Sequence, residues 1–324
     1  MKKYDDDLEF GSLNEDSRDS RFIVPIIIVA VLLAIVIAAL VLIGKNGKNK
    51  DTSADPMATE QSETTEAEAQ TTEVMGTIEA TESAEEADAD DPQGSNMVGN
   101  ETGASVDVTA LLSAGSVAES GETTFGIDVA RYQGTIDWSQ VAASGVQFAM
   151  IRVGYRTQKT GEIVADTNAK YNMQEAQANG IKIGVYFFST AVTEDEAVQE
   201  ADWVADYISQ YQITYPVAFN CEGFENADSR QYAMTQSERT DLAIAFLNEI
   251  YNRGYTPMFY AAKNEMLGDA KWDTSRIEKT YKIWVSQYPS VPYPQTAQSD
   301  YTGTHAMWQY TNQGTVAGLS LIHI

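Results

Sequence analysis

Acidic and aromatic side chains stand where several short apolar runs of this sequence end. Asp128 lies near the end of one run, Asn220, Cys221 and Glu222 follow another, and tyrosines end several more. A carboxylic acid can protonate a glycosidic oxygen, and aromatic rings stack on the faces of sugars. The pattern therefore favours chemistry on a carbohydrate, provided that the fold brings these ends together.

The order of the three residues after the fourth run decides which of them can work together. Side chains alternate along a strand, so Asn220 and Glu222 share one face and Cys221 takes the other. We expect Cys221 to pack as a small apolar side chain rather than act as a nucleophile, because no histidine stands near it in the sequence.

Composition excludes several other classes of chemistry. The single cysteine of the 324 residues rules out a disulfide framework and a CxxC metal or redox site, and two histidines cannot build a His-rich metal centre. A net charge of -26 argues against nucleic-acid binding, which needs a basic face. The chain also lacks a Gly-rich phosphate loop.

The elements that must position these residues alternate between strand and helix patterns. The second half of the chain holds seven apolar runs that indicate strands, at 125–129, 148–153, 181–188, 216–220, 256–260, 282–286 and 306–310. Thr193 with Glu196 and Thr235 with Glu238 predict capping boxes at the starts of two helices between them. Gly254 is expected to end the second of these helices.

Strands that alternate with helices predict a mainly parallel sheet, and about 200 residues fit one α/β barrel better than two domains. Working residues of such barrels gather at the carboxyl ends of the strands. Besides the acids, this edge carries a set of predicted substrate-binding residues: Tyr155, Tyr186, Phe188, Tyr260, Tyr288 and Gln309.

Residues 22–43 are apolar throughout and long enough to cross a bilayer as a helix. A cleaved signal peptide is the alternative, but the run exceeds an ordinary signal core and follows a charged tail at residues 1–21. Lysines and arginines flank both ends almost equally, so the positive-inside pattern decides little. We expect a single-pass membrane protein with a cytoplasmic N-terminus and an extracellular C-terminal domain.

Residues 44–124 are predicted to form a disordered acidic linker. From residue 51 to 124 there are eighteen Asp and Glu, no Lys or Arg and few aromatic residues, so this stretch cannot bury a core of its own. The remaining residues, 125–324, are expected to form the catalytic domain. The oligomeric state is left open, because no heptad pattern or repeat indicates assembly.

Several blocks of residues 125–319 together resemble the glycoside hydrolase family 25 lysozymes. They are GIDVARYQGTIDWSQVAASGVQFAMIRVGYR, GIKIGVYFFSTA, PVAFNCEGF, GYTPMFYA, KIWVSQYP and HAMWQYTNQGTVAGL. The resemblance implies a flattened, irregular TIM-like β/α barrel. It also implies an enzyme that cleaves the β-1,4 bond between N-acetylmuramic acid and N-acetylglucosamine in peptidoglycan glycan strands, without a cofactor.

The same resemblance implies roles for three residues. Glu222 matches the proposed general acid, and Asp128 matches the aspartate of the first strand. Asn220 stands where the family has an aspartate. The substrate's own N-acetyl oxygen would meet the positive charge at the anomeric carbon, and Asn220 could hold that group without supplying negative charge. With that anion gone, burial must keep Glu222 protonated.

A final family aspartate is not found, and the sequence ends GLSLIHI; we expect a truncated or misread end, and reduced but nonzero activity. The main hypothesis is a membrane-anchored peptidoglycan hydrolase. A catalytically weakened peptidoglycan-binding domain is the alternative that Asn220 favours. Another barrel glycosidase, such as one acting on chitin, has less support, because its DxxDxDxE pattern is matched only at its final acid. The choice between retention and inversion stays open.

Overall fold

The computed structural model describes residues 90–93, 103–113 and 123–319. The predicted cytoplasmic tail, the predicted membrane helix at 22–43 and most of the predicted linker lie outside these residues. Within the three described ranges, no helix combines the length and the apolar character that a membrane crossing requires.

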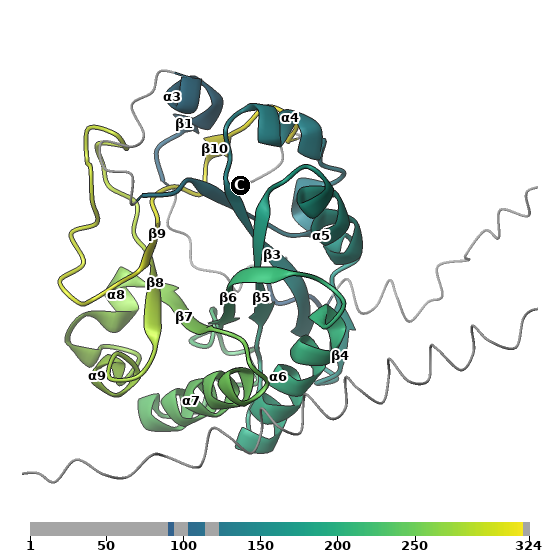
Figure 1. The fold of residues 1–324 in the computed structure, drawn as a ribbon. Coiled ribbons are helices and arrows are strands. Elements are labelled where there is room, and N and C mark those ends of the chain that lie inside the picture. Colours follow the sequence, from purple (N-terminus) through teal and green to yellow (C-terminus); the bar gives the residue numbers. More distant parts are fainter. Residues whose placement is uncertain (1–89, 94–102, 114–122, 320–324) are drawn as a thin grey trace, which may run out of the picture. The chain divides into compact units, whose positions relative to one another are not determined.

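An eight-stranded, curled sheet forms the centre of the domain (Figure 1). Its spatial order is β2-β3-β5-β6-β7-β8-β9, all parallel, and β4 pairs with β3 antiparallel. All seven predicted strands are confirmed. The strands are β2 (Gly126–Val129), β3 (Phe148–Arg156), β4 (Ile163–Ala165), β5 (Lys182–Phe188), β6 (Ile213–Asn220), β7 (Pro257–Ala262), β8 (Lys282–Ser286) and β9 (Met307–Gln309).

Helices cover the outer face of this sheet, as the alternating pattern predicts. α5 packs on β3 and β5, and α7 packs on β6 and β7 (Figure 1). The helices that follow β2 and later strands are α4 (Trp138–Ala143), α5 (Ala169–Ala178), α6 (Glu194–Ile208), α7 (Gln236–Asn252), α8 (Lys263–Met266) and α9 (Thr274–Ile277). Short 3-10 turns lie at η1 (Arg131–Gln133) and η2 (Leu267–Asp269).

One of the two predicted capping boxes is confirmed. Thr235 accepts from the backbone of Glu238, and the Glu238 carboxylate accepts from Thr235 in return. At the start of α6, Thr193 accepts from the backbone of Glu196, but the carboxylate of Glu196 accepts from the backbone of Val192 instead. This reach to the preceding residue satisfies a different backbone donor, so the α6 cap is only half of the predicted box.

The two faces of the sheet have different contents. The outer face joins the helices in the main hydrophobic core, which includes Val217, Phe219 and Cys221 from the fourth parallel strand. The inner face holds a second, smaller cluster made of Phe148, Met150, Tyr186, Ala218, Met258, Tyr260 and Trp284. Residues 218 and 220 therefore face inward, and Cys221 is buried outward with its thiol 2.9 Å from Gln231 Oε1. The predicted alternation around Cys221 is confirmed.

The prediction of a closed barrel is wrong in one respect. Among the described strands, β2 and β9 end the sheet and do not pair with each other. β9 is only three residues long, so it offers little backbone for pairing. The fold is a curled, mainly parallel half-barrel, and side chains rather than backbone hydrogen bonds connect its two edges.

Residues 103–113, predicted to belong to the disordered linker, are folded onto the domain. β1 (Val106–Asp107) pairs in parallel with β10 (Gly314–Thr315), and α3 (Val108–Ser113) follows it. Val108 also lines the apolar pocket between the two sheet edges. A stretch that cannot fold alone can still add a strand to an existing domain, which is why composition misplaced this boundary.

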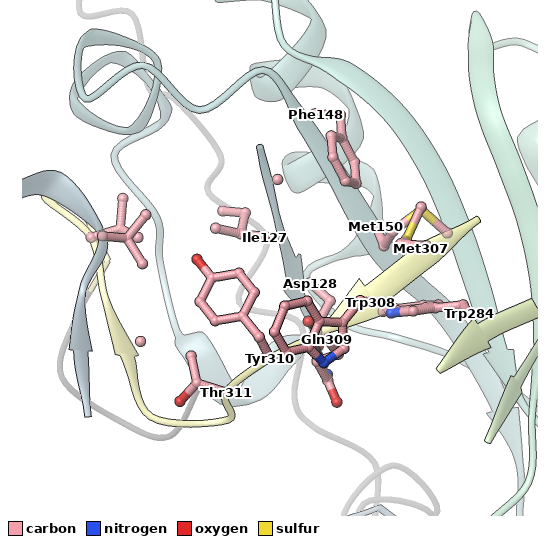
Figure 2. Close-up of a pocket in the computed structure, with 14 residues that line it drawn as sticks. Ile127, Asp128, Phe148, Met150, Trp284, Met307, Trp308, Gln309, Tyr310 and Thr311 are labelled. Atoms are coloured by element: carbon pink, nitrogen blue, oxygen red, sulfur yellow. Dashed lines mark hydrogen bonds between the residues drawn. The ribbon is translucent and has the colours of Figure 1, made fainter. Parts of the chain in front are cut away.

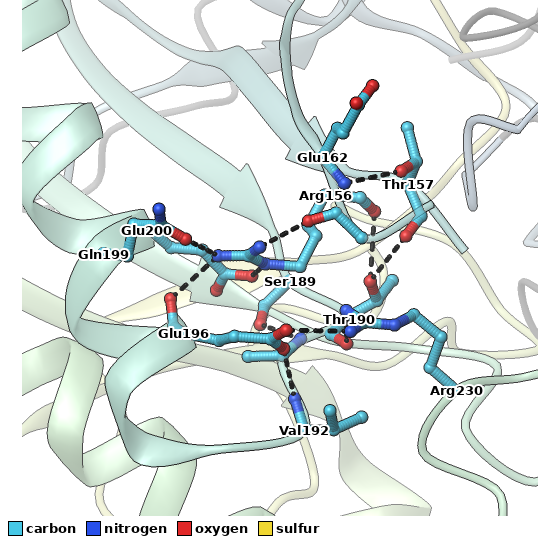
Figure 3. Close-up of polar contacts among 12 residues, drawn as sticks. Arg156, Thr157, Glu162, Ser189, Thr190, Val192, Glu196, Gln199, Glu200 and Arg230 are labelled. Carbon is cyan, nitrogen blue, oxygen red and sulfur yellow. Dashed lines mark hydrogen bonds and ion pairs between the residues drawn. The ribbon is translucent and has the colours of Figure 1, made fainter. Parts of the chain in front are cut away.

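A buried polar network fixes the connections after β3 and β5 (Figure 3). The Arg156 guanidinium lies 2.7 Å from the Glu200 carboxylate, and both side chains are almost inaccessible to water. Arg156 also donates to the backbone of Gly161 and Glu196. These bonds tie the end of β3 to α6, so they hold the loops at one side of the carboxyl edge.

Candidate active site

Asp128 and Gln309 join the two open edges of the sheet at its carboxyl end (Figure 2). Gln309 Nε2 donates to both carboxylate oxygens of Asp128, each at 3.0 Å. The amide oxygen of the same side chain accepts from Tyr260 at 3.0 Å and from Tyr288 at 2.8 Å. Four of the predicted site residues are thus brought together by hydrogen bonds.

Burial and hydrogen bonding act on Asp128 in opposite directions. Burial raises its pKa, and the hydrogen bond from Gln309 lowers it, with burial the larger effect. Gln309 also fixes the orientation of the carboxyl group, because one amide nitrogen contacts both of its oxygens. The Asp128 carboxyl group is therefore fixed in orientation and points to the inner side of the sheet.

Glu222 follows β6 and shares the inner side with these residues. Burial is the largest cause that raises its pKa to about 8, and the charges of Glu265 and Asp128 raise it further. The hydrogen bond from Asn220 opposes this rise. Burial thus acts in the direction that the sequence predicts, towards a protonated carboxyl group, which is the form that a general acid needs.

Asn220 is 3% exposed and lies at the end of β6, two residues from Glu222. Its side chain hydrogen-bonds to Glu222, whereas its amide oxygen has no hydrogen-bond partner within the described part of the chain. A buried carbonyl oxygen without a partner costs free energy unless something donates to it. A substrate N–H would satisfy this oxygen.

Glu265 is a site residue that the sequence reasoning missed. It lies in α8, three residues after β7 ends, and its Oε2 accepts from Trp272 Nε1 at 3.2 Å. Burial raises its pKa to about 7. The sequence does contain a signal for Glu265, because an acid follows the carboxyl end of a strand. The predicted strand ends at Tyr260, so Glu265 lies beyond the residues that were predicted to form the site.

The other predicted substrate-binding residues divide by exposure. Tyr186 lies on the inner face, 4% exposed, and the charge of Asp128 contributes to raising its pKa after the larger effect of burial. Tyr155 and Phe188 are fully buried, so neither offers a ring surface to a sugar in this structure. The Tyr155 ring instead packs 5.0 Å from the guanidinium of Arg152.

The sequence from residue 127 to residue 319 matches glycosyl hydrolases family 25. This match covers more than half of the chain. The chain belongs to glycosyl hydrolase family 25. The prediction of a glycoside hydrolase is confirmed at this level, and the resemblance read from the sequence blocks is confirmed with it.

Several solved structures are similar to this family 25 domain. The spore cortex lytic enzyme SleM of Clostridium perfringens superposes with a TM-score of 0.50 at 18% identity, covering 63% of this chain and 67% of that one. The autolysin LytC of Streptococcus pneumoniae gives 0.49 at 21% identity, covering 61% and 44%. A lysozyme of Streptomyces coelicolor gives 0.47 at 20% identity, covering 63% and 91%.

The family 25 chain therefore spans less than half of the length of the pneumococcal autolysin that it matches. No curated protein matches the chain significantly. Within the described ranges, no three His, Cys, Asp or Glu side chains are grouped to hold a metal ion. The polar groups of the candidate site are carboxyl, amide and phenol groups, which suit hydrogen bonding and proton transfer to a glycan.

Proposed function

We propose that this protein hydrolyses the β-1,4 bond between N-acetylmuramic acid and N-acetylglucosamine in peptidoglycan. The observation that carries the proposal is the raised pKa of Glu222, beside Asp128 and Asn220 on the inner side of a family 25 sheet. The similar structures include an autolysin, a spore cortex lytic enzyme and a lysozyme, which agree with this substrate.

In the proposed mechanism, Glu222 donates its proton to the glycosidic oxygen as the bond to the anomeric carbon breaks. The N-acetyl oxygen of the substrate bonds to the anomeric carbon as the leaving oxygen departs. Water then attacks this carbon, displaces the N-acetyl oxygen and gives a proton to the Glu222 carboxylate. The unpartnered oxygen of Asn220 accepts from the N-acetyl N–H and holds this group in position. Asp128, fixed by Gln309, supplies the nearby negative charge that favours the cationic transition state.

Asn220 favours a second candidate, a domain that binds peptidoglycan and turns it over slowly or not at all. An amide at this position supplies no charge to the transition state, although it supports binding. The two candidates differ in turnover and agree in binding, so a measurement of released reducing ends separates them.

The test mixes the full chain with purified peptidoglycan and follows the release of reducing ends. We expect release by the native chain and its loss in Glu222→Gln. Glu249→Gln is the matched control, because it removes one carboxylate from the far end of α7 and leaves the inner face untouched. Binding without release by the native chain favours the second candidate, and undiminished release by Glu222→Gln contradicts the mechanism.

We also propose that residues 22–43 anchor the chain in the cell membrane with the family 25 domain outside. The apolar length of the segment and the extracellular position of the proposed substrate support this arrangement. Protease treatment of intact cells tests it: an exposed domain is digested, and a protected domain contradicts the proposal.

A further inference from the structure

Two arginines beside the candidate active site hold a carboxylate that comes from outside the sheet. Arg152 Nη1 donates to Asp91 Oδ1 at 3.0 Å, and Arg152 Nη2 donates to Asp91 Oδ2 at 2.7 Å. Arg131 Nε lies 3.2 Å from the same Oδ2. The side chains of Asp91 and Arg152 are both fully buried. Asp91 belongs to the segment 90–93, which the sequence assigned to the disordered linker.

The arginines are held in place by groups other than Asp91. Arg152 Nε donates to Asp166 Oδ2 at 2.7 Å, and the backbone of Arg131 donates to the same oxygen at 3.0 Å. The rings of Tyr132 and Tyr155 each lie 5.0 Å from the Arg152 guanidinium. Stacked between two rings and fixed by Asp166, the guanidinium presents its remaining edge in one orientation.

The charges of this cluster balance only when a further anion is present. Arg131 and Arg152 carry two positive charges, and Asp166 carries one negative charge. Asp91 makes the cluster neutral, and a planar guanidinium edge fits a carboxylate through two parallel hydrogen bonds. Without Asp91, a net positive charge would remain in a largely buried place, and such a place attracts an anion strongly.

The cluster adjoins the catalytic carboxyl groups. Asp128 pairs with Met150 in the register of β2 and β3, so Arg152 stands two residues nearer the carboxyl edge of β3. Arg152 pairs in turn with Tyr186 on β5. The hydroxyl of Tyr186 lies 3.3 Å from the amide of Gln93, and Arg152 Nη1 donates to Gln93 Oε1 at 2.8 Å.

Asp90 secures the same segment from its other side. Its carboxylate oxygen accepts from the backbone of Lys159 at 2.6 Å, and its carbonyl accepts from the backbone of Gln158 at 3.4 Å. Asp90 and Asp91 are both buried. Residues 90–93 thus dock on the inner side through charged and polar contacts, over the inner face that a glycan must approach.

We propose that Arg131 and Arg152 form a subsite for a carboxylate of the glycan substrate, and that Asp91 occupies this subsite as an internal competitor. The inference rests on the proposed function, because an N-acetylmuramic acid residue without its stem peptide carries a free lactyl carboxylate, which the neutral N-acetylglucosamine lacks. A glycan carboxylate binds only when Asp91 leaves, so the apparent affinity falls in proportion to the time that Asp91 occupies the subsite.

The experiment measures binding calorimetrically, with the full chain carrying Glu222→Gln so that no glycan is cleaved. The probes are a tetrasaccharide of alternating N-acetylglucosamine and N-acetylmuramic acid with free lactyl carboxylates, and chitotetraose, which has none. If Asp91 occupies the subsite nine-tenths of the time, adding Asp91→Asn raises the affinity for the charged probe about tenfold. The affinity for chitotetraose stays within about twofold.

Gln93→Ala is the second variant, because it removes one contact between the segment and Arg152 and leaves Asp91 and both arginines in the chain. It should raise the affinity for the charged probe in the same direction and by less. Glu249→Gln is the control for the loss of one carboxylate and should change neither affinity. Thermal unfolding of each variant shows that the domain remains folded.

Three results would overturn the inference: no change in affinity for the charged probe, an equal gain for both probes, or a gain with the control as large as with Asp91→Asn. An equal gain would mean that residues 90–93 only cover the surface. A different result would contradict the proposed function alone. In that result, neither the native chain nor the Asp91→Asn chain, both with Glu222 intact, releases reducing ends, although the charged probe still binds selectively.

Discussion

Glu200 and Glu222 are two glutamates of one domain with opposite neighbours, and Glu200 is buried whereas Glu222 is half-buried. Glu200 lies 2.7 Å from the Arg156 guanidinium, on the outer side where α6 packs (Figure 3). Burial still raises its pKa to about 7. Glu222 has a raised pKa of about 8, but the charges that act on it are those of Glu265 and Asp128.

The different neighbours of the two glutamates indicate the role of each carboxyl group. At Glu200 the Arg156 guanidinium opposes the effect of burial on the pKa, and the pair ties two elements together. A buried carboxyl group among other acids avoids carrying charge, so it keeps a proton that it can donate. The glutamate on the inner side of the sheet is therefore suited to proton donation, and the glutamate on the outer side stabilises the fold.

The largest effect is expected for Glu222→Gln. An amide cannot donate the proton that the leaving oxygen needs, so turnover of peptidoglycan should fall about 10²–10⁴-fold. Release of reducing ends at pH 6 measures this.

Stability separates this loss from unfolding. Because the folded-state pKa of Glu222 lies above its ordinary value of 4.5, its contribution to stability is present below that value and is lost as the pH rises through about 8. Glu222→Gln has no such loss and should be at least as stable as the native chain at pH 9. A less stable variant would mean that the residue is structural.

Glu200→Gln should act on stability instead. It leaves the buried Arg156 without its charge partner, at a cost of about 3–5 kcal/mol in the free energy of unfolding. Denaturant unfolding measures this cost, and turnover per folded molecule should stay unchanged. A cost under about 1 kcal/mol, as for an ordinary surface substitution, would remove the contrast between the two glutamates.

Asn220→Asp should raise turnover several-fold, because it restores a negative charge beside the anomeric carbon. It also replaces a donor to Glu222 by a like charge, so the pKa of Glu222 should rise. The alkaline limb of the dependence of kcat/KM on pH should then move to higher pH. If the alkaline limb shifts and turnover stays unchanged, residue 220 affects only the pKa of Glu222.

The smallest effect is expected for Glu265→Gln. Removing this neighbouring charge lowers the pKa of Glu222, so the alkaline limb should move to lower pH. Turnover at pH 5, where Glu222 is protonated in both chains, should stay unchanged. A shift in the opposite direction would mean that Glu265 acts on Glu222 in some way other than by its charge.

The sequence predicted the strands and the shared face of Asn220 and Glu222, because both follow from local periodicity. Asn220, Cys221 and Glu222 alternate on a strand whichever domain contains it, and burial then follows from the inner side of a parallel sheet. Glu265 escaped prediction because its proximity to Glu222 depends on how α8 turns back after β7, which no local pattern records.

The segments 90–93 and 103–113 escaped prediction for another reason. Composition reports whether a stretch can form a core of its own, and these residues form none. Asp91 is buried because two arginines of the domain receive it, and β1 forms because β10 offers an edge. Both events depend on partners 40 or more residues away along the chain.

The central claim is that Glu222 carries a proton at neutral pH, and a titration of its carboxyl group tests that claim most directly. The side-chain carboxyl carbon is followed by NMR in a chain with ¹³C-labelled glutamate, and its signal is assigned by its absence in Glu222→Gln. The account predicts a midpoint at about pH 8. A midpoint near the ordinary value of 4.5 would contradict it, because the carboxyl group would then be ionised where it must donate.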